Sequence, residues 1–120
     1  MWEIWQEKNR VIVGSKEREG TIKVGKDNDR VRVTDYSYDD KISKDELEEV
    51  FMKDVICGRN DIVMVVYEYK TKYVILYEGK KEALEKQARE NVQETREHSE
   101  LVFYEDGRRR EWKSLFPHNE

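Results

Sequence analysis

The most apolar part of this chain is the pair of runs Ile62-Val63-Met64-Val65-Val66-Tyr67 and Tyr73-Val74-Ile75-Leu76-Tyr77. Both runs are rich in β-branched and aromatic residues, which favour strands. The short polar connection Lys70-Thr71-Lys72 predicts a hairpin between them. Neither run alternates between apolar and polar residues, as is typical of strands that are covered on both faces. We therefore expect this hairpin at the centre of a sheet.

Short strands are expected before the hairpin, at Arg10–Val13, Thr21–Val24 and Arg30–Thr34. The first run ends at Gly14, and a turn rich in Gly, Asp and Asn at positions 25–29 precedes the third. Short runs bounded by such residues, the third of them alternating, are typical of a half-buried antiparallel meander. The sequence therefore predicts an N-terminal β-meander.

A first helix is predicted between the meander and the hairpin, over Ser43–Val55. The apolar residues that share one face of this helix are Leu47, Val50, Phe51 and Val55. Their spacing is that of a helix with one buried side. Ser43 and Glu46 form the pattern of a capping box, in which each side chain satisfies a free amide of the first turn. Gly58 follows as a helix stop.

A second helix is predicted from Lys80 to about His98, followed by a strand at Leu101–Tyr104. The thin apolar stripe of this helix consists of Ala83, Leu84, Ala88 and Val92. A strand, a helix and a strand in sequence imply a right-handed crossover with parallel pairing. We expect an α+β fold: a mixed sheet with an N-terminal β-meander, a central hairpin and two helices. Residues 1–120 would form a single domain, with 105–120 as a flexible or docking tail.

The composition narrows the class of protein. The 120 residues include 23 basic and 27 acidic side chains, which gives a net charge of −4, and 11% are aromatic. A small net charge and many aromatics favour a folded domain over disorder. No half of the chain is basic, which disfavours nucleic acid as a partner. Many Lys and Glu with few Asn and Gln are typical of hyperthermophile proteins, so a thermophilic source is one interpretation.

The compartment is expected to be the cytoplasm. Cys57 is the single cysteine, so no intrachain disulfide can form, as suits a reducing environment. The first residues lack the pattern of a signal peptide, and no apolar run approaches the roughly 20 residues of a membrane-spanning helix. We expect no membrane partner.

The segment 35–46 resembles an EF-hand calcium loop. Asp35, Ser37, Asp39 and Glu46 fall on oxygen-ligand positions of that loop, and Glu46 takes the place of its bidentate glutamate. The resemblance implies a calcium site. Asp40 stands where the loop needs glycine, and a strand is expected where the entering helix belongs. The alternative is a capping box at the helix start, preceded by a solvated turn of aspartates.

The turn at Gly79-Lys80-Lys81 is a candidate phosphate site. It joins a predicted buried strand to the start of a helix, where free amides and the helix dipole favour anions. Two lysines add positive charge, and glycine allows close approach. The alternative is a lysine-rich helix start with no ligand.

The order of elements over residues 31–104 resembles the ParB N-terminal-like fold: strand, helix, hairpin, Gly-basic turn, helix, strand. In that family a box of glycine and mostly arginine residues opens a helix and holds nucleotide phosphates. Here the box would be Gly79-Lys80-Lys81-Glu82, with Glu82 in place of its last arginine. The resemblance implies a nucleotide- or DNA-associated module.

The remaining residues of types that take part in catalysis or metal binding do not form a recognisable catalytic site. Cys57 beside Arg59 is expected to be a small buried hydrophobe, the alternative being a thiol whose pKa the arginine lowers. His98 and His118 have no partner at the spacing of a zinc site or a catalytic pair. The many Asp and Glu residues give no reason to pair any two of them. We therefore expect a protein without catalysis.

Aromatic residues gather in the terminal segments, together with a run of arginines. The candidate interface residues are Trp2, Trp5, Arg109, Trp112 and Phe116. Aromatic residues and Arg are enriched at protein interfaces. These residues either pack on the domain's own sheet or form a surface for self-association or a protein partner. A contact between the arginines beside Trp112 and nucleic acid is a further alternative.

The function expected from the sequence is that of a small non-catalytic protein that binds a macromolecular partner. By analogy with compact, charged domains of viruses and mobile elements, such a protein would modulate host proteins in the host cytoplasm. The alternatives are a ParB-like nucleotide- or DNA-associated module and a calcium-binding protein. Nucleotide and calcium are accordingly the candidate ligands, and no cofactor is expected otherwise.

Overall fold

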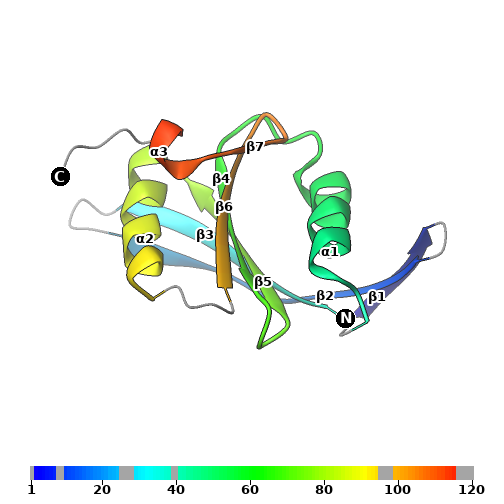
Figure 1. The fold of residues 1–120 in the computed structure, drawn as a ribbon. Helices are drawn as coiled ribbons and strands as arrows, with labels where there is room; N and C mark the ends of the chain where they lie inside the picture. The colour runs from blue at the N-terminus through cyan, green and yellow to red at the C-terminus, as the bar shows by residue number, and fades with distance from the viewer. Residues whose placement is uncertain (1, 8–9, 25–28, 39–40, 95–98, 116–120) are drawn as a thin grey trace.

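Figure 1 shows the computed structural model of the chain, which describes residues 2–7, 10–24, 29–38, 41–94 and 99–115. These residues form one sheet in the order β1-β2-β3-β5-β4-β6-β7. The strands are β1 (Trp2–Glu7), β2 (Arg10–Val24), β3 (Asp29–Tyr38), β4 (Val63–Glu68), β5 (Tyr73–Gly79), β6 (Ser99–Glu105) and β7 (Arg108–Arg110). The helical segments are α1 (Lys44–Phe51), the π-helical η1 (Met52–Ile56), α2 (Lys81–Glu94) and α3 (Trp112–Leu115). The expected α+β class is confirmed.

The predicted hairpin is formed by β4 and β5, which pair in an antiparallel ladder. Its turn closes through Lys72, which has a φ of 65° and whose N–H donates to the carbonyl of Glu68 at 3.1 Å. Residues Val63–Tyr67 of β4 are all buried. β5 and β6 flank β4, so the hairpin occupies the centre of the sheet, as predicted from its lack of alternation.

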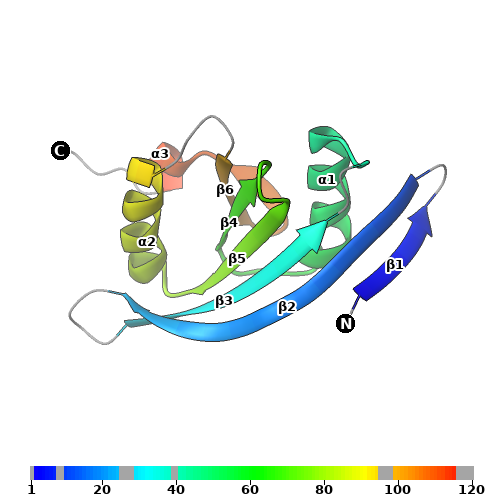
Figure 2. The same ribbon diagram turned by 90° about the horizontal axis from the view of Figure 1, so that it is seen from below.

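The N-terminal meander is present, but with different strands. β2 is a single strand of 15 residues where the sequence predicted two, Arg10–Val13 and Thr21–Val24. β1, which was not predicted, pairs with the first part of β2. Figure 2 shows the β1 end of this ribbon extending beyond α1.

Ion pairs explain why the polar middle of β2 stays in the sheet. Arg18 pairs with Asp35 of β3 at 2.6 Å, and Arg32 of β3 pairs with Glu19 at 2.9 Å. A bulge between Lys16 and Arg18 shifts the register without ending the strand. Cross-strand pairs of opposite charge thus replace the apolar residues that a sequence pattern looks for.

The first helix begins as predicted. The Ser43 hydroxyl accepts from the Glu46 amide at 3.2 Å, and the Glu46 carboxylate accepts from the Ser43 amide at 3.2 Å, which completes the capping box. The predicted range Ser43–Val55 covers both α1 and most of η1, because the chain widens into a π-helical segment after Phe51. Gly58 then adopts a φ of 87°, which suits glycine.

The predicted mixed sheet with parallel pairing is wrong. α2 connects β5 to β6, and these two strands run in the same direction, but β4 lies between them. Every neighbouring pair of described strands is therefore antiparallel. The physical reason is burial: β4 is the most completely apolar strand and gains most from a central position with a partner on each side. The predicted end of the second helix, at 95–98, lies outside the described residues.

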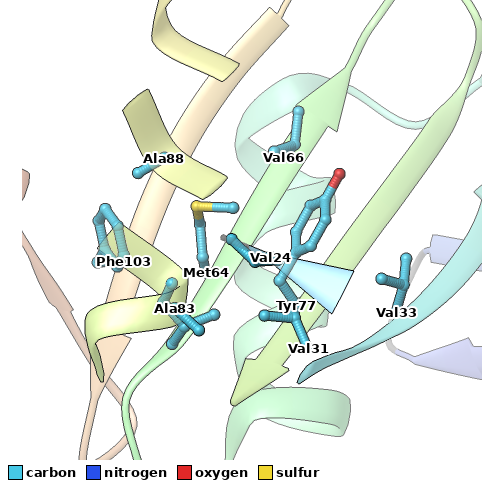
Figure 3. Close-up of a cluster of buried hydrophobic side chains, with 10 residues drawn as sticks. Val24, Val31, Val33, Met64, Val66, Tyr77, Ala83, Ala88 and Phe103 are labelled. Carbon is cyan, nitrogen blue, oxygen red and sulfur yellow. The ribbon is translucent and has the colours of Figure 1, made fainter. Parts of the chain in front are cut away.

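Two apolar layers cover the two faces of the sheet, with α2 on one side and α1 on the other (Figure 1). The core under α2, which we call the α2 face, is drawn in Figure 3 and consists of Val24, Val31, Val33, Met64, Val66, Tyr77, Ala83, Leu84, Ala88 and Phe103. The core under α1 and η1, the α1 face, consists of Leu47, Phe51, Ile56, Val63, Val65, Tyr67, Val74, Leu76, Val102 and Tyr104. Alternate residues of β4 thus point to different layers.

Candidate functional site

The predicted calcium-loop residues are spread over two elements. Asp35 and Ser37 lie on β3, and Glu46 lies in the first turn of α1, where it closes the capping box. Asp35 pairs with Arg18 at 2.6 Å. Asp39 lies outside the described residues. Within the described ranges, no group of three or more His, Cys, Asp or Glu side chains could hold a metal ion. Calcium binding stays a prediction.

The predicted phosphate turn lies where β5 meets α2. A Cβ at Gly79 would lie 3.0 Å from the carbonyl oxygen of Arg30, so the close approach of β3 favours glycine here. Lys80 and Lys81 are exposed at the start of α2. Beside Gly79 is a hollow of about 650 Å³, lined in part by Arg32 and Arg59.

Both arginines of this hollow already have carboxylate partners. Arg59 pairs with Glu78, which also lines the hollow, and Arg32 pairs with Glu19 at 2.9 Å. An incoming phosphate would therefore compete with carboxylates for these guanidinium groups. Binding of a nucleotide phosphate here stays a prediction.

The terminal aromatic residues do not form one surface. β1, with Trp2 and Trp5, and α3, which begins at Trp112, lie at opposite ends of the molecule (Figure 1). Trp112 is half-buried against the core of the α2 face. The side chains of Trp2 and Trp5 and the whole of Phe116 lie outside the described part of the chain. Residues 105–115 of the expected tail form the end of β6, β7 and α3, with β7 paired to β6.

Arg109, the fifth predicted interface residue, joins a cluster that sequence reasoning missed. We call it the ionic cluster: Glu48 of α1, Glu100 of β6 and Arg109 of β7. Arg109 donates to both carboxylates, to Glu100 at 2.6 Å. Tyr69, just after β4, donates its hydroxyl to the other oxygen of Glu100 at 2.8 Å. One guanidinium thus links a helix to two strands.

The two carboxyl groups of the ionic cluster differ in acidity. Burial and the neighbouring charge of Glu100 raise the pKa of Glu48 above its usual value. Burial also acts to raise the pKa of Glu100, but the hydrogen bonds from Tyr69 and Arg109 outweigh it and lower that pKa. The pKa values of the two carboxyl groups are therefore shifted in opposite directions.

A pair of buried tyrosines lies near the ionic cluster, in the core of the α1 face. The hydroxyls of Tyr67 and Tyr104 are 2.7 Å apart, and both side chains are fully buried. Burial raises the pKa of Tyr104 to about 12 and also raises the pKa of Tyr67. Each hydroxyl is the hydrogen-bond partner of the other, which removes the penalty of burying it alone.

The residues of the ionic cluster could not have been paired from sequence. Glu48 and Glu100 belong to elements far apart in the chain, and each is one of many similar acids. Their positions give no usable signal either, since Glu48 lies in the middle of α1 and Glu100 near the start of β6. The geometry makes the cluster a cross-link between α1 and the β6–β7 edge.

Cys57 is exposed, so the expectation of a buried cysteine is wrong. The chain leaves helical geometry at Cys57, where ψ is 131°, and Ile56 takes the buried position instead.

The open edges of the sheet differ from one another. β7 is a three-residue edge made only of arginines. The outer side of β2 beyond Ser15 has no strand partner in the described part of the chain, and its sequence is mostly charged. Charged and very short edge strands resist pairing with other strands. Among the described strands β1 pairs only with β2, and its sequence includes Trp2, Ile4 and Trp5 but no Lys, Arg or Pro. The outer edge of β1, which we call the β1 edge, carries two charged residues, Glu3 and Glu7, and is therefore less charged than the other open edges.

No known family model, curated protein or solved structure matches this chain. Within the described residues, every helix is too short or too polar to cross a membrane.

Proposed function

We propose that this chain is a non-catalytic binding protein that captures an extended segment of a partner protein at the β1 edge. The observation that carries the proposal is the contrast between this edge and the two charged edges of the same sheet. An added strand pairs its main chain with an open sheet edge, and its side chains give specificity. The long ribbon of β1 and β2 extends beyond α1, which leaves room for such a strand (Figure 2).

The sequence of β1 indicates what kind of segment would pair with it. Glu3 and Glu7 are its charged residues, and the rest of the strand is apolar or neutral. Opposite charges and aromatic or β-branched residues are the favourable cross-strand pairs. The expected segment is therefore extended, partly aromatic or β-branched, and basic.

The test places the same substitution on two different edges. Ile4→Lys puts a charge on the β1 edge, and Ile22→Lys puts one on the charged outer edge of β2, where Ile22 is already 39% exposed. Each variant would carry a C-terminal affinity tag, so that β1 stays free, and retained proteins would be quantified against the unchanged chain. We expect Ile4→Lys to lose its retained partner and Ile22→Lys to keep it.

Two outcomes count against the proposal. A partner that both variants retain equally does not bind the β1 edge. A partner that is lost from Ile22→Lys but kept by Ile4→Lys binds the other edge. Light scattering on the purified chain identifies the case in which the partner is a second copy.

A second candidate is nucleotide binding beside the Gly79-Lys80-Lys81 turn, favoured by the hollow of about 650 Å³ that adjoins Gly79. It predicts a rise in melting temperature with a nucleotide and magnesium, abolished by Lys80→Ala combined with Lys81→Ala. A ligand at about a hundred times its Kd stabilises by about 2.7 kcal/mol, which a melting curve resolves. An unchanged melting temperature at millimolar nucleotide would exclude this candidate.

A further inference from the structure

The pairing of β1 with β2 places the residues of β1 in two rows, one on each face of the sheet. Directly opposite residues of an antiparallel pair lie on the same face, and successive residues of a strand alternate between faces. Glu3 lies opposite Gly14, and Gly14 lies opposite Tyr38 of β3. Tyr38 packs against the core of the α1 face, so Glu3 belongs to the row on that face.

The other row of β1 places apolar residues on both sides of this glutamate. Ile4 follows Glu3 in the strand and therefore lies on the opposite face, in register with Val13. Trp2 precedes Glu3 and shares the face of Ile4. Along the β1 edge, one charged position on the α1 face is thus flanked by two apolar positions on the α2 face.

The two glutamates of β1 differ in the residue that β2 places opposite each of them. Glu7 lies opposite Arg10, so its position on that side is already taken by a basic residue. Glu3 lies opposite Gly14, which has no side chain. Residues of opposite charge at directly opposite positions form a favourable pair. A directly opposite basic residue for Glu3 can therefore come only from a strand on the outer side of β1.

A strand added at the β1 edge would continue both rows. This end of the sheet extends beyond α1 and lies at the opposite end of the molecule from α2 (Figures 1 and 2). The added residue opposite Glu3 would lie on the α1 face, and the residues before and after it would lie opposite Trp2 and Ile4. Aromatic and β-branched residues pair favourably with one another across strands, so these are the types expected at the two flanking positions.

We propose that the β1 edge captures an extended segment in which a basic residue lies opposite Glu3 and is flanked by aromatic or β-branched residues opposite Trp2 and Ile4. The inference rests on the proposed function, because it names the pattern of the segment captured there. Capture of a strand does not itself require this pattern, so the two can be tested separately.

The test uses two peptides and the full isotope-labelled chain observed by NMR. The first peptide is acetyl-Thr-Val-Tyr-Lys-Val-Thr amide, which in antiparallel pairing places its lysine opposite Glu3 and its tyrosine opposite Ile4. The second has glutamate in place of the lysine. We expect saturable shifts of β1 amides, with the lysine peptide bound about fivefold more tightly, as for one exposed ion pair.

The outcomes separate this inference from the proposed function. Equal affinities of the two peptides, measured at the amides of β1, would overturn the pattern but leave strand capture standing. If neither peptide shifts these amides, the pattern is overturned and strand capture at the β1 edge is contradicted as well.

Variants assign the preference to one residue. Glu3→Lys should reverse it, so that the glutamate peptide binds about fivefold more tightly. Glu82→Lys changes the net charge equally at the exposed start of α2 and should leave the lysine peptide preferred. Glu7→Gln should also keep this preference, because Glu7 lies four residues further along the strand.

Two results with these variants contradict the proposal: an unchanged preference in Glu3→Lys, and a preference that is lost in Glu7→Gln. Should Glu3→Lys lose the dispersed spectrum of a folded chain, Glu3→Gln replaces it. The preference for lysine should then disappear without reversing, and a preference that persists in Glu3→Gln counts against the proposal.

Discussion

The α2 face and the α1 face of the same sheet are packed with different kinds of side chain. Under α2 the helix contributes Ala83, Leu84 and Ala88, and the sheet contributes mainly valine, methionine and phenylalanine. Under α1, aliphatic residues surround a set of aromatic contacts, in which Tyr36, Phe51 and Tyr67 meet edge to face at centroid distances of 5.4 and 5.9 Å. Its rim carries the ionic cluster.

This difference determines what each face responds to. The α2 face depends mainly on packing, because apart from Tyr77 its core consists of apolar side chains. The α1 face depends on packing and on hydrogen bonds between groups that titrate. The stability of the α2 face should respond to changes in side-chain volume, and the stability of the α1 face should respond to pH as well.

The largest effect is expected on the α2 face. Phe103 is fully buried, and Phe103→Ala leaves a cavity that should lower the free energy of unfolding by about 3–5 kcal/mol. Urea denaturation measures the change. Leu101→Ala on the same strand is the control, because Leu101 is only partly buried and should cost less. Equal losses at the two positions would contradict this description of the core.

On the α1 face, Tyr67→Phe should cost about 1–3 kcal/mol, because it leaves the buried hydroxyl of Tyr104 without a partner. The double variant Tyr67→Phe, Tyr104→Phe removes both hydroxyls and should recover part of that loss. Denaturant unfolding of the two single variants, Tyr67→Phe and Tyr104→Phe, and of the double variant gives the coupling energy between the two residues. If the double variant loses as much as the single losses summed, the hydroxyls do not interact.

The same hydroxyls should make the chain less stable at alkaline pH. The pKa of Tyr104 is about 12 in the folded chain against an ordinary value of 10.0. A pKa raised by folding means that this stability is complete below about pH 10 and is lost as the pH rises toward 12. The part of the tyrosinate absorbance that comes from Tyr104 should therefore appear together with unfolding. Tyr104→Phe should weaken this dependence, and an unchanged alkaline transition would rule out Tyr104 as its source.

A smaller effect is expected at the start of α1. Ser43→Ala removes the hydroxyl of the capping box and should cost about 1 kcal/mol. Thermal unfolding followed by circular dichroism measures it. Ser114→Ala, in the short C-terminal helix α3, is a control in which another exposed serine hydroxyl is removed away from any long helix. A larger loss at Ser114 than at Ser43 would contradict the assigned cap.

The smallest effect is expected from the ionic cluster, whose members are partly exposed. The raised pKa of Glu48 gives stability that is lost as the pH rises through that pKa. The lowered pKa of Glu100 gives stability that is lost as the pH falls through its own. The two oppose each other around the ordinary value of 4.5. Glu48→Gln should therefore make the free energy of unfolding fall more steeply below pH 4.5. If the free energy of unfolding of this variant, measured against pH, falls as in the unchanged chain, the pair is uncoupled.

Local features of the fold could be predicted from the sequence. The hairpin, the capping box at Ser43 and Glu46, and the stripe of Ala83, Leu84 and Ala88 each depend on residues a few positions apart. β1 and the unbroken length of β2 could not be predicted, because β1 depends on pairing with β2 and the polar middle of β2 is held by ion pairs with β3. The prediction of a mixed sheet was wrong because the partner of each strand is distant in the sequence and is not encoded locally.

The candidate site was less predictable than the fold. The sequence singled out Arg109 as an interface residue, but its carboxylate partners, Glu48 and Glu100, come from other elements. The position of Glu3 opposite Gly14 could not be inferred at all, because it depends on the register of β1 against β2.

By itself, the sequence determined the class of fold, the central hairpin and the helix start at Ser43, because these follow from backbone preferences and from contacts within a turn. Only the tertiary structure decided that β4 lies between β5 and β6, that Glu48 meets Glu100, and that β1 is left with one open edge. These depend on burying both faces of one strand at once, which brings distant segments together and leaves others at the rim.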